Sequence, residues 1–513
     1  MALGTRPNWI KVLSCYHEKG GEGMGEQLKT CCLPHFTPAM TGKVRGAKLS
    51  SYAIALEAWR RGLKVVMHDR RMFRYTIYSS GWRHGIKLNL SWGGKFFPSV
   101  SISPQKKVYT FRRSEIVDRH AKPRFKICNN KDITKRLLRE KNIPVPDGKR
   151  FGSADSDEEI IKYSLNNIGF PVVLKPATGS LGKGVFVNIR DEVALKKYLV
   201  HVREELGYSN IIVEEYVEGE DLRVFVAGNK VLGVVKRVPA NIVGDGKQTI
   251  KELIEKKNLL RKTNPFLANR QIKIDREIID HLNASGHSID SVLGKNEVLF
   301  LRSKGSGGDP IDITDDIPES IKDLAVRAVK AIPHLYSCGV DIMFDRTKGS
   351  QGKGVVIELN CRAHIGLHLF PLKGEARDVS GGIIDYCFPE SSARRGQNSR
   401  LYFDPELVLR PFISGFAKDI VLAPPPSGRI RYRRLELRGK MASKLKRTLR
   451  RKALSLNISG HIKDLKNGNL RVVLAGKKRD IDAFKSYLSK EIPGGLVNER
   501  RWSRAVAAGF RIY

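Results

Sequence analysis

The pattern of apolar positions predicts two strands on either side of a glycine-rich segment. Residues 172–174 and 185–187 are short runs rich in β-branched side chains, and Gly179, Gly182 and Gly184 lie between them. Apolar runs of this length separated by glycines are typical of strands joined by a loop. The common phosphate loops instead run from a strand into a helix. We therefore expect a hairpin flap whose backbone N–H groups can approach the phosphates of a ligand.

Polar side chains on neighbouring strands suit phosphate and metal binding. Lys175, directly before the flap, would place a compact positive charge on a phosphate oxygen. Residues 339–361 predict a strand pair that carries Asp341, Glu358 and Asn360. Because Glu358 and Asn360 are two residues apart on a strand, their side chains share one face. Two carboxylates and an amide oxygen suit Mg²⁺, which prefers hard oxygen ligands and is usually shared with substrate phosphates.

The order of these motifs resembles the ATP-grasp domain of cyanophycin synthetases and of the fused bacterial glutathione synthetases. The similarity runs from about residue 130 to residue 389 and covers half of the chain. The matching segments are 131–138, 143–146, the flap, 214–223, 236–246, 305–315, 338–341 and 358–360. The ordered set is far more specific than any of its members, each of which alone is also compatible with a solvated surface charge.

The resemblance implies a role for each matching residue. Lys131 and Lys175 would bind the phosphates of ATP, and the main chain around residues 214–217 would hold the adenine. Asp221 falls where a carboxylate usually holds the ribose hydroxyls. The expected nucleotide contacts are Lys131, Lys175, Gly179, Ser180, Gly182, Lys183, Gly184, Glu214, Glu215, Val217 and Asp221. Asp341, Glu358 and Asn360 fall where the family binds its magnesium ions, so the expected metal is Mg²⁺ or Mn²⁺.

Three arginines are candidates for the catalytic step. Arg302 precedes a glycine pair and is a candidate for steadying an acyl phosphate, and Arg223 and Arg237 are candidates for similar work on a substrate carboxylate. After the metal motif many relatives continue into a Pro-Gly turn, which helps to shape the acceptor pocket. This chain continues instead through His364 and His368, so the second substrate stays open. Without a third ligand nearby, the two histidines favour a structural or substrate-contacting role over a metal site.

The N-terminal part of the chain predicts a separate α/β subdomain. Apolar positions from residue 49 onward recur at helical spacing, and Gly62 ends the helix before a strand over residues 63–67. Alternating segments at 85–91 and 100–103 would add strands. Before this subdomain the chain is irregular, and Cys15, Cys31, Cys32 and His35 lack the ordered second pair of a zinc site.

The C-terminal part has a βαββαβ rhythm from about residue 429 to residue 513 and resembles an acylphosphatase domain. Active members hold phosphate with an arginine and position water with an asparagine. By spacing, Lys446 and Asp464 occupy these positions here. Because a carboxylate at the asparagine position would repel phosphate, we expect the domain to be catalytically silent.

Composition and charge restrict the partners and the compartment. The 513 residues are 41% hydrophobic and 28% charged, as in soluble proteins of several domains, but the formal net charge is +39. Residues 391–513 contribute +20 of this charge, with 29 Lys and Arg against 9 Asp and Glu. This excess is compatible with a solubilising surface or with an anionic partner such as an acidic peptide, a carrier protein or RNA.

Seven cysteines without regular spacing favour a reducing compartment, and no apolar signal core or long apolar run appears. We therefore expect a cytoplasmic protein that does not enter the membrane, and we expect a homo-oligomer.

These segments predict a multidomain α/β and α+β protein with an ATP-grasp fold. The expected parts are an irregular segment (1–40), an N-terminal α/β subdomain (41–127), the ATP-grasp domain (128–390), a linker (391–428) and an acylphosphatase-like, ferredoxin-like domain (429–513). The resemblance implies ATP-dependent ligation of a carboxylate to an amine through an acyl phosphate, with release of ADP and phosphate. We expect the substrate to be an amino acid or an acidic peptide. Two alternatives stay open: a small-molecule kinase without ligation, and a nucleotide-gated binding module whose basic tail holds nucleic acid.

Overall fold

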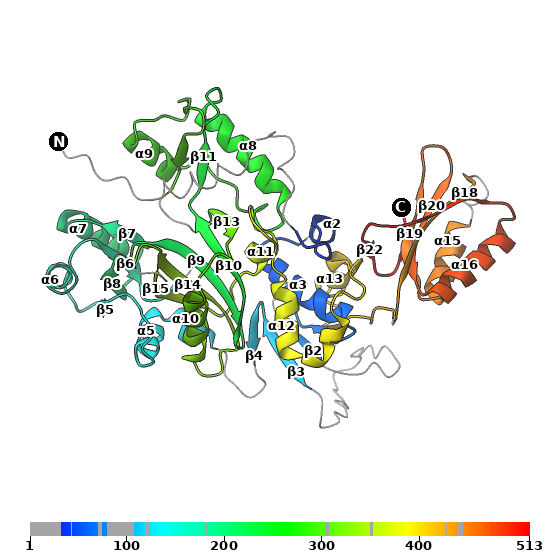
Figure 1. Cartoon of the computed structure of the whole chain (residues 1–513), viewed down its shortest axis with the longest axis horizontal. Coiled ribbons are helices and arrows are strands. Elements are labelled where there is room, and N and C mark those ends of the chain that lie inside the picture. Colours follow the sequence, from blue (N-terminus) through cyan, green and yellow to red (C-terminus); the bar gives the residue numbers. More distant parts are fainter. Residues whose placement is uncertain are drawn as a thin grey trace.

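The computed structural model is a mixed α/β fold of several sheets and covering helices, as the sequence predicts (Figure 1). It describes residues 32–42, 44–69, 74–78, 107–117, 124–179, 183–302, 307–348, 352–426, 428–439 and 445–513. The strands predicted at 85–91 and 100–103, together with Cys15 and Cys31, lie outside these residues. Within the described ranges, no helix is long and apolar enough to span a membrane.

The N-terminal subdomain is built on one central helix, α3 (Ala47–Arg60), which follows the short helix α2 (Pro38–Thr41). Its sheet has the strand order β17-β1-β2-β3-β4. The bounds are β1 (Lys64–Met67), β2 (Arg74–Tyr78), β3 (Val108–Arg112), β4 (Glu115–Val117) and β17 (Ile420–Val421). Helix α3 is buried on all sides, including its charged residues Glu57 and Arg60, because distant parts of the chain cover it. Tyr52 and Trp59 donate hydrogen bonds to backbone carbonyls of Phe403 and Ala423, at 2.9 and 2.6 Å.

The segment 391–428, expected to be a linker, contains regular structure that returns to this subdomain. A 3₁₀ helix, η3 (Pro389–Arg394), is followed by β16 (Leu401–Tyr402) and helix α13 (Pro405–Ile413). Strand β17 then pairs antiparallel with β1, with Val66 opposite Val421. A strand far along the chain therefore completes the N-terminal sheet.

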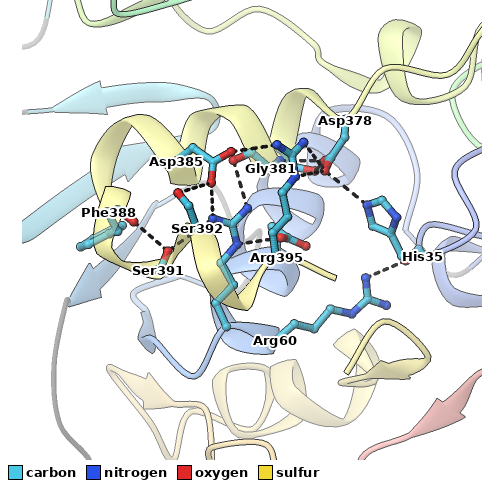
Figure 2. A network of polar contacts seen from close by, with 12 residues as sticks. His35, Arg60, Asp378, Gly381, Asp385, Phe388, Ser391, Ser392 and Arg395 are labelled. Carbon is cyan, nitrogen blue, oxygen red and sulfur yellow. Dashed lines mark hydrogen bonds and ion pairs between the residues drawn. The ribbon is translucent and has the colours of Figure 1, made fainter. Parts of the chain in front are cut away.

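A buried polar network joins α3 to helix α12 (Val379–Cys387), as Figure 2 shows. Arg61 is 1% exposed. It donates to Glu57 Oε1 at 2.7 Å, to Asp385 Oδ1 at 2.6 Å and to the carbonyl of Gly381 at 3.2 Å. Since every charge in this network has a partner, the two helices can pack through polar side chains.

Residues 128–390, where the ATP-grasp fold is expected, contain two antiparallel sheets. The smaller has the order β5-β8-β6-β7 and the larger the order β13-β10-β9-β14-β15. The first comprises β5 (Gly148–Phe151), β6 (Val172–Pro176), β7 (Phe186–Ile189) and β8 (Ile211–Glu215). The second comprises β9 (Glu220–Ala227), β10 (Lys230–Val238), β13 (Asp309–Asp312), β14 (Ser337–Asp345) and β15 (Lys353–Asn360).

Helices cover these sheets and follow the local signals in the sequence. They are α4 (Phe125–Asn129), α5 (Lys131–Arg139), α6 (Asp157–Tyr163), α7 (Glu192–Val200), α10 (Glu319–Lys330) and α11 (Gly366–Leu369), with π-helical turns at Ser164–Ile168 and His201–Glu205. Helix α6 begins with a capping box between Ser156 and Glu159. Between residues 244 and 302, where mostly helix is expected, α8 (Ile250–Thr263) and α9 (Arg276–Ala284) pack beside the pair β11 (Asn241–Val243) and β12 (Val298–Phe300).

The C-terminal domain has the predicted βαββαβ order. Its elements are β18 (Arg431–Leu437), α15 (Lys446–Ser455), β19 (Ser459–Asp464), β20 (Leu470–Gly476), α16 (Lys478–Glu491), β21 (Leu496–Arg501), β22 (Val506–Ala507) and β23 (Phe510–Ile512). The sheet order is β21-β18-β20-β19-β23, and α15 and α16 share its core on one face. On the other face Tyr432, Val473 and Ala475 join the core that surrounds α3.

Replacing Arg61 with methionine tests whether the polar network between α3 and α12 stabilises the fold. The change leaves Glu57 buried without its partner, so the free energy of unfolding should fall by about 3 kcal/mol. Urea denaturation followed by circular dichroism measures the loss. Lys322→Met on α10, which breaks only the surface pair with Glu319, is the control and should cost less than about 1 kcal/mol. Equal losses in the two variants would contradict a structural role for the network.

Candidate active site

The predicted metal residues lie side by side because of strand register. Asp341 on β14 is directly opposite Glu358 on β15 and opposite Arg223 on β9. Arg223 forms two hydrogen bonds with Asp341, one of them from Nη2 to Oδ2 at 3.1 Å. Arg237 on β10 reaches the same Oδ2 at 3.2 Å, and the side-chain amide of Asn360 donates to it at 3.3 Å. The structure therefore brings two of the three candidate arginines to the candidate metal ligands.

The electrostatics of this cluster favour a cation. Burial raises the pKa of Glu358, and the neighbouring Asp341 raises it further. Burial opposes ionisation of Asp341 as well, but Arg223 and then Arg237 outweigh it and lower the pKa of that carboxyl. Two adjacent buried carboxylates and an amide oxygen form a donor set that fits a hard divalent ion. Within the described ranges, no three His, Cys, Asp or Glu side chains come together as a metal site, so any ion here would need Asn360 or a substrate oxygen.

The predicted phosphate-binding lysines lie on the facing sheet and on the helix beside it. Lys175, on β6, forms an ion pair with Glu214 at the end of β8. Lys131, at the start of α5, is 8% exposed and approaches the carbonyl of Gly179 at 3.5 Å. Burial lowers the pKa of Lys131, while Glu358 opposes the shift. The positive charge of Lys131 therefore lies beside Gly179, where the flap begins.

Lys135 is a member of this cluster that the sequence interpretation missed. It lies one helical turn after Lys131 on α5 and forms a second ion pair with Glu214. Burial, followed by the charge of Lys175, lowers the pKa of Lys135 to about 7. Glu214, 2% exposed, keeps a lowered pKa because Lys175 and Lys135 together outweigh its burial. The spacing of four residues from Lys131 was the available signal, since it places both lysines on one helix face.

The remaining nucleotide candidates line the connection between the two sheets. Asp221, on β9, accepts a hydrogen bond from Arg237 Nε at 3.1 Å, and burial raises its pKa. Glu215 ends β8, and its backbone N–H donates to the carbonyl of Asp147 at 2.8 Å. Val217 follows in the turn that leads into β9.

Part of the predicted flap can be described. Gly179 and Gly184 both have positive φ, at 141° and 70°, where a side chain would be strained. Lys183 lies beside Gly184 in the turn that precedes β7. The predicted contacts Ser180 and Gly182 lie outside the described residues.

Arg302 lies in a different environment from the other two arginines. Its guanidinium forms ion pairs with Asp275 and Glu277 at the start of α9. The described partners of Arg302 are residues 273, 275 and 277, whereas those of Arg223 and Arg237 are Asp341 and Asp221.

The N-terminal subdomain contacts the segment that follows Asn360. Ser114, in the turn between β3 and β4, donates to the carbonyl of Ala363 at 2.6 Å, and Arg362 pairs with Glu115 at 2.8 Å. The carbonyl of Ser114 accepts a hydrogen bond from Ser337 at 2.8 Å. No sequence motif signals this contact, because it joins residues more than 200 positions apart.

Of the two histidines of this segment, His368 is buried and His364 is half-buried, and lowered pKa values keep both neutral at physiological pH. Burial, followed by the charge of Arg270, lowers the pKa of His364 to about 4. Burial, followed by Arg223, lowers the pKa of His368 to about 3. Among the residues that the structure describes, neither ring nitrogen of His368 has a hydrogen-bond partner. Both positions are consistent with the structural or substrate-contacting role expected from the sequence.

Comparisons with known proteins find two kinds of domain in this chain. A family model described as a RimK-like ATP-grasp domain matches residues 128–249, and one described as acylphosphatase matches residues 445–506. Cyanophycin synthetase from Synechocystis sp. is 38% identical over 276 residues, which cover 52% of this chain and 31% of that protein. The glutathione biosynthesis bifunctional protein GshAB from Listeria welshimeri is 33% identical over 269 residues, covering 51% of this chain and 34% of that protein.

A bifunctional glutathione synthetase from Pasteurella multocida, solved as a crystal structure, has 25% sequence identity and a TM-score of 0.45. The aligned part covers 67% of this chain and 43% of that one. The chain thus spans about a third of the length of the curated relatives named above. It contains an ATP-grasp domain. More particularly, this domain is of the RimK-like kind and is followed by a C-terminal acylphosphatase domain, which confirms the resemblance read from the sequence.

The pKa of Lys135 predicts a pH dependence of nucleotide binding. Below about pH 7 the protonated lysine shares Glu214 with Lys175, so more of the positive charge of Lys175 is available to a phosphate. Above that pH Glu214 is balanced by Lys175 alone, and affinity for ADP should fall by about threefold to tenfold.

Fluorescence titration with a labelled ADP between about pH 6 and pH 9 measures this effect in the wild type and in Lys135→Met. The variant mimics the deprotonated state and lacks the titrating lysine, so it should bind ADP weakly and with a flatter pH profile. The titration of ADP itself is common to both proteins and does not affect the comparison. Parallel profiles in the two proteins would contradict the assignment.

Proposed function

We propose that the protein is an ATP-dependent ligase that joins a carboxylate to an amine through an acyl phosphate and releases ADP and phosphate. One observation carries the proposal: Lys131 and Lys175, beside the flap, interact electrostatically with Glu358, which lies opposite Asp341 in the neighbouring sheet of an ATP-grasp domain. The similarity to enzymes named cyanophycin synthetase and glutathione biosynthesis protein supports the same reaction class. We also propose the division into N-terminal subdomain, ATP-grasp domain and C-terminal domain, with residues 391–428 partly belonging to the first.

The proposed reaction begins with binding of the triphosphate. Lys131, Lys175 and the backbone N–H groups of the flap would hold the phosphates, and the turn from Glu215 to Val217 would hold the adenine. Asp341, Glu358 and Asn360 would hold Mg²⁺ or Mn²⁺, which when bound offsets negative charge as the γ-phosphate passes to a carboxylate.

Arg223 and Arg237 have a direct part in the proposed transfer. Both reach Asp341, so their guanidinium groups border the place where the phosphorylated carboxylate would form. Charge-assisted hydrogen bonds from these groups would orient its oxygens and stabilise the charge that develops on them. Arg302 would act only if a substrate drew it away from Asp275 and Glu277.

The second half-reaction forms the amide. The acyl phosphate has an electrophilic carbonyl, and an amine held against it attacks that carbon, loses a proton and displaces inorganic phosphate. The segment after Asn360, held by Ser114 and Glu115, would shape the acceptor side. The net charge of +39 favours an acidic amino acid or peptide as substrate.

Two other functions compete with the ligase. A kinase built on the same site would form ADP without any amine. A nucleotide-gated module would bind nucleic acid through the basic C-terminal part and turn over no ATP, but the complete set of lysines and acidic residues at the grasp site argues against it.

Phosphate release from Mg·ATP with pooled amino acids and acidic peptides tests the proposal. Glu358→Ala should reduce turnover by at least about 100-fold, because it removes half of the carboxylate pair. Glu319→Ala, which removes an exposed carboxylate on α10, is the control and should leave turnover unchanged. ADP that requires both a carboxylate and an amine supports ligation. ADP without an amine requirement favours a kinase, and AMP as product would contradict the mechanism.

The C-terminal domain should not hydrolyse acyl phosphates. Lys446 Nζ and Asp464 Oδ2 form an ion pair at 2.6 Å, so the two residues at the acylphosphatase positions neutralise each other. We expect no hydrolysis of benzoyl phosphate by the wild type. Lys446→Ala and Asp464→Ala should leave ATP turnover unchanged as well. A colorimetric phosphate assay measures both reactions, and a loss of turnover in either variant would show that the domain takes part in catalysis.

A further inference from the structure

The C-terminal domain contains an arginine-lined cleft of about 730 Å³. Six arginines contribute to its walls: Arg400, Arg429, Arg431, Arg433, Arg500 and Arg501. It lies where β18 begins and β21 ends, with Arg400 approaching from the segment before β16. Figure 1 shows this sheet on the far side of the molecule from β14 and β15, which carry the candidate active site.

The cleft is also separate from the acylphosphatase positions of the same domain. In the sheet register Asp464 lies opposite Leu470, and Leu470 lies opposite Leu437 at the end of β18. Arg431 starts the same strand six residues earlier, opposite Gly476 at the far end of β20. The two places are therefore at opposite ends of β18.

The positive charge of the cleft is largely uncompensated. Its one acidic residue, Glu499, is already paired with Arg433 at 3.1 Å and with Lys485 at 2.6 Å. Arg400 donates to the carbonyl of Trp502 at 2.8 Å and stacks over the ring of Tyr432. In the described part of the chain, no carboxylate pairs with any of the other four: Arg429, Arg431, Arg500 and Arg501. Four guanidinium groups at one cleft repel each other and create a strong local attraction for anions.

The backbone at the cleft suits an extended peptide. Strand β21 is an edge of the sheet and pairs with β18 on one side. Its residues Glu499, Arg500 and Arg501 border the cleft and are exposed, so this part of the edge is open to solvent. An edge strand offers unpaired N–H and C=O groups that a second extended backbone can use. A nucleic acid has no matching row of amide groups.

The cleft also lacks a surface for stacking nucleobases. Of the described residues that line the cleft, one is aromatic, Tyr432, and it is only 6% exposed. The guanidinium of Arg400 covers its ring, 4.1 Å from the ring centre. Binding of single-stranded nucleic acid commonly depends on exposed aromatic faces. Arginine forks match carboxylates and phosphates alike with two parallel hydrogen bonds. The preference for a peptide therefore rests on the open edge of β21 and on the covered ring of Tyr432.

We infer that this cleft is a docking site for an acidic peptide segment, which adds as a strand to the edge of β21 while its carboxylates pair with the four unpaired arginines. The site is independent of ATP and of the proposed ligase reaction. It assigns the basic C-terminal domain an acidic peptide as ligand and the cleft between β18 and β21 as the binding site.

Fluorescence anisotropy tests this inference with the full-length protein and a labelled ten-residue peptide of Asp and Glu, without nucleotide. The variant Arg429→Gln/Arg431→Gln/Arg500→Gln/Arg501→Gln should bind at least about tenfold more weakly at about 150 mM salt. The matched control is Arg447→Gln/Arg451→Gln/Lys478→Gln/Lys490→Gln, which removes the same charge from α15 and α16 of the same domain. It should change the affinity by less than about threefold.

Two further ligands decide between the possible modes of binding. A peptide of the same charge with pairs of adjacent prolines between its acidic residues lacks N–H groups on both of its edges. It cannot pair regularly with β21 and should bind more weakly than the first peptide. A single-stranded RNA of equal charge should bind less tightly than the acidic peptide. Tighter binding of RNA, equal losses in the two quadruple variants, or no binding of the acidic peptide would each overturn the inference. Unchanged circular dichroism spectra of both variants exclude a loss of folding.

Discussion

Compensation of buried charge is the constraint on which the candidate site depends. Asp341 is 7% exposed and Glu214 is 2% exposed. An ionised carboxylate buried without a partner is strongly destabilising, so each must be surrounded by cations. Arg223 and Arg237 form ion pairs with Asp341, and Lys135 and Lys175 form ion pairs with Glu214. These partners come from different strands and from α5, so the ion pairs also fix the register of β9, β10 and β14 and the position of α5 against β6 and β8.

The same charges connect structure with the proposed chemistry. Asp341 and Glu358 repel each other, and burial strengthens the effect, so the pair is poised to accept a divalent cation. Arginines that neutralise Asp341 in the protein alone would be free to turn toward a substrate carboxylate once another cation shared that side chain. On the opposite sheet, the ammonium groups near the flap are already desolvated, which strengthens their attraction for phosphate.

Local patterns predicted much of the fold and part of the site. The alternation around Glu358 and Asn360 placed both on one strand face, and the order of motifs indicated an ATP-grasp domain. The return of residues 420–421 to pair with β1 could not be predicted, because it depends on packing against a helix more than 300 residues earlier. Helix α3 is buried on its charged face as well, a result of the network with α12 that hydrophobic periodicity does not reveal. The ion pair of Lys135 with Glu214 also depends on tertiary structure, because the two residues are 79 positions apart in the sequence.

The measurement that tests the central claim most directly is the fate of a carboxylate oxygen. Once a carboxylate substrate has been found, it is labelled with ¹⁸O and turned over with Mg·ATP and its amine, and the released phosphate is analysed by mass spectrometry. Transfer through an acyl phosphate predicts one ¹⁸O atom in each inorganic phosphate, with ADP as the other product. Unlabelled phosphate, or label recovered in AMP, would contradict the account.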